Sequence, residues 1–140
     1  MTIPDPLIAL RAFIAADAAV IVLAGTRVFA EELPKAEADL QPRSTVLLES
    51  AGGPASRDFV RLGRTGVDVR TYGVTPLHAM KLHLAVHEAL KHLERVVQTP
   101  GPVLLHSVAA LGGPLALRDP DASWPFVFRS YELLAAEAAA

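Results

Sequence analysis

The fold that the sequence predicts depends on residues 75–96, which read TPLHAMKLHLAVHEALKHLERV. Threonine followed by proline is a strong helix start, because the threonine can cap the first backbone amides and proline suits the first turn. At roughly 100° per residue, one face of this helix is apolar and the opposite face is charged. The apolar face carries Leu82, Val86, Ala89, Leu90, Leu93 and Val97, and the charged face carries Lys81, Glu88, Lys91 and Arg95. We therefore expect a helix from Thr75 to about Val96 with one face packed on a sheet.

Two shorter helices are expected before it. The first begins at Asp5 and Pro6 and runs to about Ala16, and the second covers 18–23 and stops before Gly25. Extended segments are expected at 28–29, 44–49, 103–109 and 126–134, whereas the tail 135–140 is too short and small to anchor anything. Residues 58–62 and 67–72 predict a hairpin around the turn 63–66, with Val67, Val69 and Thr71 on one face.

The order of these elements predicts an α+β fold. We expect an antiparallel or mixed β-sheet with one long helix packed across a face and an N-terminal helix. We expect the 140 residues to form a single domain, 1–140, without an internal boundary. Two segments connect elements without predicted structure of their own: the proline-containing loop 31–43 and the glycine-rich tip 51–56.

Composition excludes several classes of protein. With 51% hydrophobic and 20% charged residues the chain is globular, and its net charge of −2 is too balanced for direct nucleic-acid readout. Cysteine is absent, so disulfides and thiolate chemistry are excluded. Proline and glycine break the longer uncharged run, 96–117, so no membrane span is expected. A mean hydropathy of +0.34 is high for so small a domain and indicates that apolar side chains are left on the surface, which favours self-association.

Four of the five histidines fall in the long helix and could indicate a metal site. His83 and His87 are one turn apart and share one side of the helix, but the pattern supplies no third ligand. His87 and His92 miss the His-Glu-x-x-His spacing of zinc proteases by one residue. We therefore expect no metal and no cofactor, with the histidines on a solvated or interface face.

Neither the serines nor the glycines indicate catalysis. The serines lack the Gly-x-Ser-x-Gly context of a nucleophile, and the glycines at 63 and 66 do not lead into a helix as a phosphate-binding loop would. Trp124, Phe126 and Phe128 are more typical of core packing than of a ligand site.

Charge asymmetry predicts an interaction surface. A head-to-tail contact between subunits could pair an acidic loop with a basic segment, although scattered surface charge is about as good an explanation. The candidate acidic residues are Glu31, Glu32, Glu37 and Asp39, and the candidate basic residues are Arg57, Arg61, Arg64 and Arg70. Charged runs in loops are usually solvated, so the acidic residues are expected at a rim.

The order of segments over most of the chain resembles the tail-terminator, or tail-completion, proteins of long-tailed bacteriophages and phage-like particles such as gene transfer agents. The resemblance rests on the opening helix with LIALRAF at 7–13 and AADA at 15–18, on GTRVF at 25–29, and on the strand entry 42–49. It also rests on VDVRTY at 67–72, the helix 75–93 and FVFR at 126–129.

The resemblance implies a structural protein with no enzymatic activity. Members form a homo-hexameric ring on the last ring of the major tail-tube protein, stop tube growth and present a surface to the head-side connector or stopper protein. It implies a place at the head–tail junction of a particle assembled in the cytoplasm of the host bacterium. Two alternatives remain: a head-side neck protein (connector or stopper) and a small histidine-containing metalloenzyme.

Overall fold

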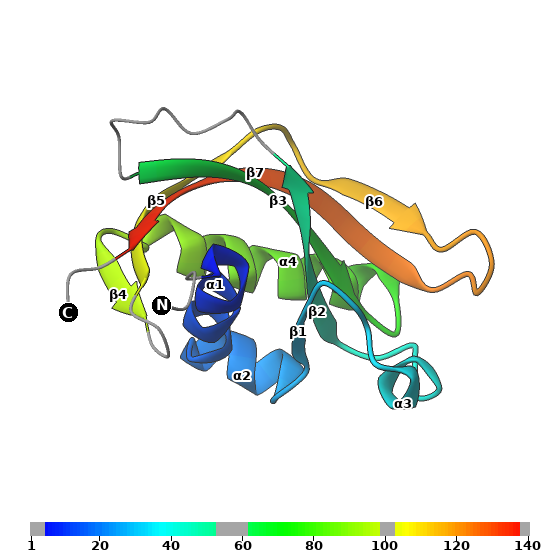
Figure 1. The fold of residues 1–140 in the computed structure, drawn as a ribbon. Coiled ribbons are helices and arrows are strands. Elements are labelled where there is room, and N and C mark those ends of the chain that lie inside the picture. The colour runs from blue at the N-terminus through cyan, green and yellow to red at the C-terminus, as the bar shows by residue number, and fades with distance from the viewer. Residues whose placement is uncertain (1–4, 53–61, 99–102, 138–140) are drawn as a thin grey trace.

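The computed structural model describes residues 5–52, 62–98 and 103–137. It contains a curved seven-stranded sheet with three of its helices, α1, α2 and α4, on the concave side and the short helix α3 apart from them (Figure 1). In chain order the elements are α1 (Pro6–Ala15), α2 (Ala18–Ala24), β1 (Val28–Ala30), α3 (Lys35–Ala38), β2 (Thr45–Gly52), β3 (Leu62–Tyr72), α4 (Pro76–Lys91), β4 (Val96–Gln98), β5 (Val103–Ala110), β6 (Leu115–Arg118) and β7 (Pro125–Glu137). The predicted α+β class, with a long helix across one face of the sheet, is confirmed.

The sheet is mixed. Its strand order is β1-β2-β3-β7-β5-β4, with β1 parallel to β2 and the other pairs antiparallel. β6 pairs with the start of β7, on the same side of β7 as β5, so β5 and β6 act as one strand interrupted by a bulge. At this bulge residues 111–114 stand opposite Arg129 and Ser130, between the pairs Ala110↔Tyr131 and Leu115↔Phe128.

The predicted hairpin turn at 63–66 is wrong. These residues lie inside β3, which runs alongside β7 from the pair Leu62↔Ala136 to the pair Tyr72↔Phe126. Because β7 is long enough to satisfy backbone groups along this whole segment, Gly63 and Gly66 stay extended despite their freedom to turn. The first half of the predicted hairpin, 58–61, lies outside the described residues.

The C-terminal tail also differs from expectation. β7 continues to Glu137, and Ala135 is buried, since β3 and β5 both pair with this end of the strand. β6 was not expected, because LALR alone is too short to distinguish a strand from a turn.

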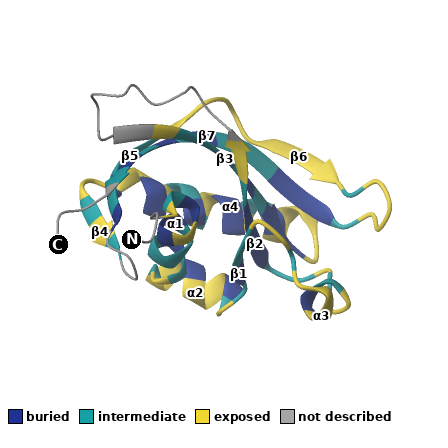
Figure 2. Ribbon diagram, in the orientation of Figure 1, coloured by how far each residue is buried: buried dark blue, intermediate teal, exposed yellow. Residues whose placement is uncertain are grey.

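α4 buries most of the predicted apolar face but ends before the predicted position, Val96. Thr75 caps it by accepting a hydrogen bond from the amide of His78 at 3.3 Å. The buried positions include Leu82, Val86, Ala89 and Leu90, with Leu93 just beyond the helix (Figure 2). The helix stops at Lys91 because residues 96–98 pair with β5, and Val97 is accordingly 55% exposed rather than part of the apolar face.

The two N-terminal helices match the prediction. Asp5 accepts hydrogen bonds from the amides of α1, Asp17 does so for α2, and α2 ends at Gly25 with a φ of 60°. The side chains of α1 join those of α4 and the inner sheet face in one core. No single helix in the described ranges is long and apolar enough to cross a membrane. Taken together, α1 and α2 are long and apolar enough, but the angle between these two helices is 83°.

Gly73 fixes the distance between the sheet and α4. A Cβ built on it would lie 2.4 Å from the backbone nitrogen of Ala79, a contact that cannot relax without moving the helix. We expect Gly73→Ala to lower the free energy of unfolding by about 1–3 kcal/mol, as overpacking does. Gly113→Ala is the matched control, because its Cβ meets nothing within 4 Å. Urea unfolding checks both, and equal midpoints would contradict the close approach.

Candidate interaction surfaces

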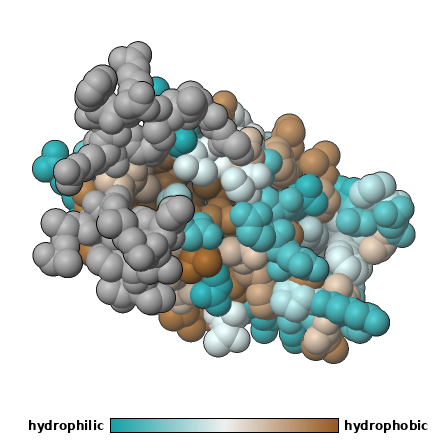
Figure 3. All heavy atoms as spheres, in the orientation of Figure 1, coloured by the Kyte–Doolittle hydropathy of each residue, from teal (hydrophilic) through white to brown (hydrophobic). Residues whose placement is uncertain are grey.

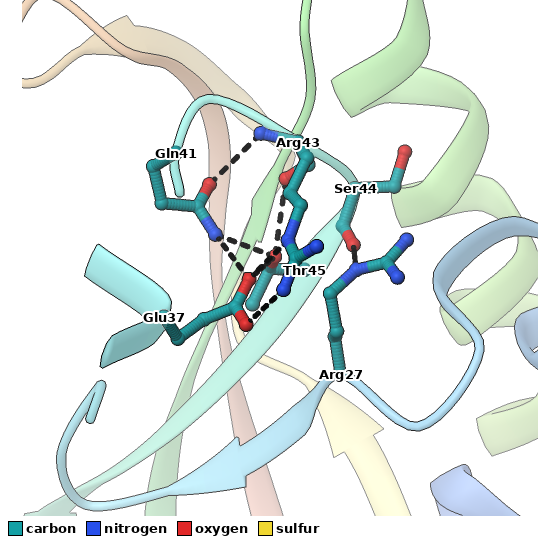
Figure 4. A network of polar contacts seen from close by, with 6 residues as sticks. All are labelled: Arg27, Glu37, Gln41, Arg43, Ser44 and Thr45. Atoms are coloured by element: carbon teal, nitrogen blue, oxygen red, sulfur yellow. Dashed lines mark hydrogen bonds and ion pairs between the residues drawn. The ribbon is translucent and has the colours of Figure 1, made fainter. Parts of the chain in front are cut away.

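The loop 31–43 is held by an ion pair between the buried carboxylate of Glu37 and the partly exposed guanidinium of Arg43, shown in Figure 4. It contains the short helix α3, whose Glu37 is only 7% exposed. The Arg43 guanidinium makes a bidentate contact with this carboxylate: Nε donates to Oε1 at 2.6 Å and Nη2 donates to Oε2. Gln41 Nε2 also donates to Oε1, at 3.0 Å. The expectation that this acidic run is solvated therefore fails at Glu37.

The same network fastens the loop to the first strands of the sheet. Gln41 Nε2 donates to the Thr45 hydroxyl at 2.7 Å, at the buried start of β2. Beside it, Arg27 Nε donates to the carbonyl of Ser44 at 2.8 Å (Figure 4). The hydrogen bond from Arg43 keeps the pKa of Glu37 below its usual value although burial acts in the opposite direction. The charge of Glu37 is thus paired within its own chain and is not available to a partner.

Three acidic side chains of this loop are exposed, Glu31 and Glu32 directly after β1 and Asp39 directly after α3, and we call these three residues the acidic surface. Glu31 follows β1 directly with a φ of 69°, and its amide donates to the carbonyl of Leu48 at 2.7 Å. This hydrogen bond holds the backbone of Glu31 against β2 and so positions the side chains of Glu31 and Glu32.

The predicted basic residues divide in the same way. Arg64 is exposed on β3, with its Nε 3.6 Å from Glu132 Oε1. Arg70 lies over the ring of Phe126 at 5.4 Å and reaches Glu49 Oε1 at 3.2 Å, so it is engaged within its own sheet. Arg57 and Arg61 lie outside the described residues. Within the described ranges, no ion pair joins the acidic surface to Arg64 or Arg70.

The outer face of the sheet carries a second, smaller core. Its buried members are Leu47, Tyr72 and Phe126, and its partly buried members are Phe29, Leu33, Trp124 and Phe128. Tyr72 packs edge-on against Trp124 at 6.1 Å between ring centres. The interpretation of the C-terminal aromatics as packing residues is therefore confirmed.

The exposed large apolar side chains include those of α2 and β6. Ile21 and Val22 on α2 are 48% and 82% exposed, and Leu115 and Leu117 on β6 are 56% and 45% exposed. Figure 3 shows the hydrophobic atoms of this face along the lower edge, over α2, and at the top, over β6. The periodicity of such short apolar segments gives no signal that separates an exposed strand from a buried one.

The histidines do not share one environment. His78 and His92 are exposed, but His83 is fully buried, which contradicts the expected solvated or interface face at this position. His83 and His87 stack at 5.9 Å, and within the described residues no group of three or more His, Asp or Glu could hold a metal ion.

Removing the charge of Glu37 tests the ion pair. We expect Glu37→Gln to lower the free energy of unfolding by about 2–3 kcal/mol, below the range for fully buried pairs because Arg43 is partly exposed. Asp39→Asn changes the same charge at an exposed neighbour and is expected to stay within about 0.5 kcal/mol of the parent protein. Chemical denaturation distinguishes the two, and equal losses would refute a structural role specific to Glu37.

The sequence matches no protein-family model and no curated protein. The solved structures that it resembles include the following two. A chain of "Structure of bacteriophage SPP1 gp17 protein" aligns with a TM-score of 0.49 and 16% identity over 91% of this chain and 89% of that one. A chain of "Virion of native gene transfer agent (GTA) particle" aligns with a TM-score of 0.69 and 19% identity over 93% of both chains. This protein therefore shares its fold with a chain of the gene transfer agent virion.

Proposed function

We propose that the protein is a structural subunit of a phage or gene transfer agent virion, and that it is the tail terminator. The observation that carries the proposal is the end-to-end similarity to a chain of the gene transfer agent particle, with a TM-score of 0.69 over 93% of both chains. The resemblance of the sequence to tail-terminator proteins supplies the specific role. Neither catalysis nor a cofactor is needed for it.

The proposed mechanism is capping. A tail tube grows because each ring offers the next one a matching face, and a ring that matches the tube on one side only ends this growth. The homo-hexameric ring of this protein would bind the last ring of the major tail-tube protein. Its other face would join the tail to the head-side connector or stopper protein, which places it at the head–tail junction of a particle assembled in the bacterial cytoplasm.

Features of the subunit support a ring held by unlike surfaces. The sheet has β1 at one edge and β4 at the other, with β6 beyond β5, so a subunit offers two different edges to its neighbours. The exposed apolar residues of α2 and β6 are surface that an assembly would cover. Heterologous contacts of this kind close into rings when the rotation between subunits permits it.

Charge provides the proposed contact between neighbours. The acidic surface would face a basic segment of the next subunit that includes Arg64, together with Arg57 and Arg61 on the adjoining segment. Glu37 and Arg70 are left out of this contact, because each is engaged within its own chain. Arg64 is kept, because its side chain is 63% exposed and its Nε comes no nearer than 3.6 Å to Glu132.

A charge swap tests that contact. Replacing Glu31 and Glu32 by lysine is expected to abolish ring formation, because lysines would then face arginines. The matched variant Arg64→Glu is expected to weaken it, and combining the three substitutions is expected to restore part of the assembly. Native mass spectrometry, with the tail-tube protein present, measures the oligomer. Rings that form equally well in every variant would contradict this interface.

Deleting the gene tests the function itself. Electron microscopy is expected to show unjoined heads beside tubes of uncontrolled length. Separate tails of normal length beside filled heads would instead assign the protein to the head side of the joint, as a stopper or connector. Intact infectious particles would overturn the structural proposal and return attention to the histidine helix.

A further inference from the structure

A polar cluster lies inside the contact between α4 and the sheet and has no part in the proposed function. His83 faces the sheet with none of its side chain exposed, and neither ring nitrogen has a hydrogen-bond partner among the described residues. His87, one turn later, stacks on it with 5.9 Å between ring centres and 21° between ring planes. The two rings therefore form one unit on the inner side of the helix.

The central strand supplies the other half of the cluster. His87 Nδ1 lies 2.9 Å from the hydroxyl of Tyr131, a residue of β7 that is 1% exposed. Two residues earlier on the same face of β7, the Arg129 guanidinium lies 5.7 Å from the centre of the Tyr131 ring. Arg129 Nε donates to the carbonyl of Gly112 at 2.7 Å, which holds this positive charge in place.

The cluster already faces the positive charge of Arg129, and no carboxylate among the described residues around it would compensate a second positive charge on His83. Arg129 comes from β7, and Lys91 and Glu88 come from α4 itself. Among the described residues, the carboxylate that acts on His87 is Glu88, but it is 62% exposed and pairs with Lys91 and His92 on the solvent side. α2 has no titratable side chain, and Asp68 of β3 bonds to Ser130 on the outer face of the sheet. The guanidinium of α1, Arg11, donates to the carbonyl of Val28.

We propose that His83, His87, Tyr131 and Arg129 form an acid-sensitive latch that releases α4 from the sheet when the pH falls. With neutral imidazoles the cluster is a packed contact with one hydrogen bond across it. A proton on His83 would place a charge in an apolar site beside Arg129, with no acceptor to receive either N–H bond. Release of α4 relieves this by exposing the ring to water.

The direction of the effect follows from the two states of His83. Burial, then Arg129, then His87 lower the pKa of His83 from 6.5 to about 4 when α4 is docked. Below pH 6.5 the released form therefore binds a proton that the docked form lacks, so stability of the docked state falls as the pH falls through this window. The docking equilibrium shifts by up to about 300-fold in total, from a pH well above 6.5 to a pH well below 4. Burial lowers the pKa of His87 too, which acts in the same direction.

Hydrogen exchange of the wild-type protein tests the release. After correction for intrinsic exchange rates, the protection of α4 amides is expected to fall about tenfold between pH 7.5 and pH 5.5, because His83 takes up one proton on release. Amides of the paired centre of β3 and β7 are expected to change less. Equal loss of protection throughout the described residues would mean that acid unfolds the whole domain, and the latch would be wrong.

Variants assign the effect to His83. His83→Leu keeps an apolar side chain in the site and is expected to reduce the fall at α4 to about threefold or less. His92→Gln, at an exposed position of the same helical segment, is expected to keep the full fall. Imidazole NMR of the wild-type protein gives a test that needs no variant: His83 is expected to stay neutral at pH 5.5. A charged His83 at that pH, with α4 still protected, would overturn the proposal.

Discussion

The pairing of β3 with β7 is the interaction on which the rest of the structure depends. It extends without a break from Leu62↔Ala136 to Tyr72↔Phe126 and gives the sheet a long central ribbon. The inner face of this ribbon receives α4, and its outer face carries Tyr72 and Phe126 of the smaller core. Because β7 is longer than β5, its N-terminal part is left for β6 to pair with, beyond the bulge. The position of both sheet edges follows from this one pair of strands.

The sequence predicts the elements whose signals are local and misses those set by distant partners. Capping residues and apolar periodicity locate α1, α2 and α4, and the alternation at 67–71 identifies the buried face of β3. The extended path through Gly63 and Gly66, by contrast, exists because β7 pairs with it, and the paired residues Ala135 and Glu132 lie about seventy residues away in the chain. The early end of α4 is also caused by a partner later in the chain, because Val96–Gln98 pair with β5 and lie in the sheet.

Charged residues show a similar limit. The sequence places Glu37 in an acidic run and Arg70 in a basic one, but composition does not reveal that each is already paired inside the chain. A weak signal exists for Glu37: Gln41 lies one helical turn later and Arg43 follows a proline, so both can fold back on the carboxylate. The sequence gives less warning for His83, because it stands between two leucines of which Leu82 is buried and Leu84 is exposed. Burial decides its character, and burial depends on which face the sheet covers.

These internal contacts also narrow the surface that a partner can use. The inner face of the sheet is covered by helices, and the outer face near Phe126 is occupied by aromatic rings and Arg70. What stays open among the described residues includes the acidic surface that begins after β1, the apolar side chains of α2, and β6 with its leucines. β1 and β6 lie on opposite sides of the β3–β7 ribbon. A rigid ribbon with unlike surfaces on its two sides suits a subunit that meets different neighbours at each side, because the angle between the two contacts is then fixed by the fold.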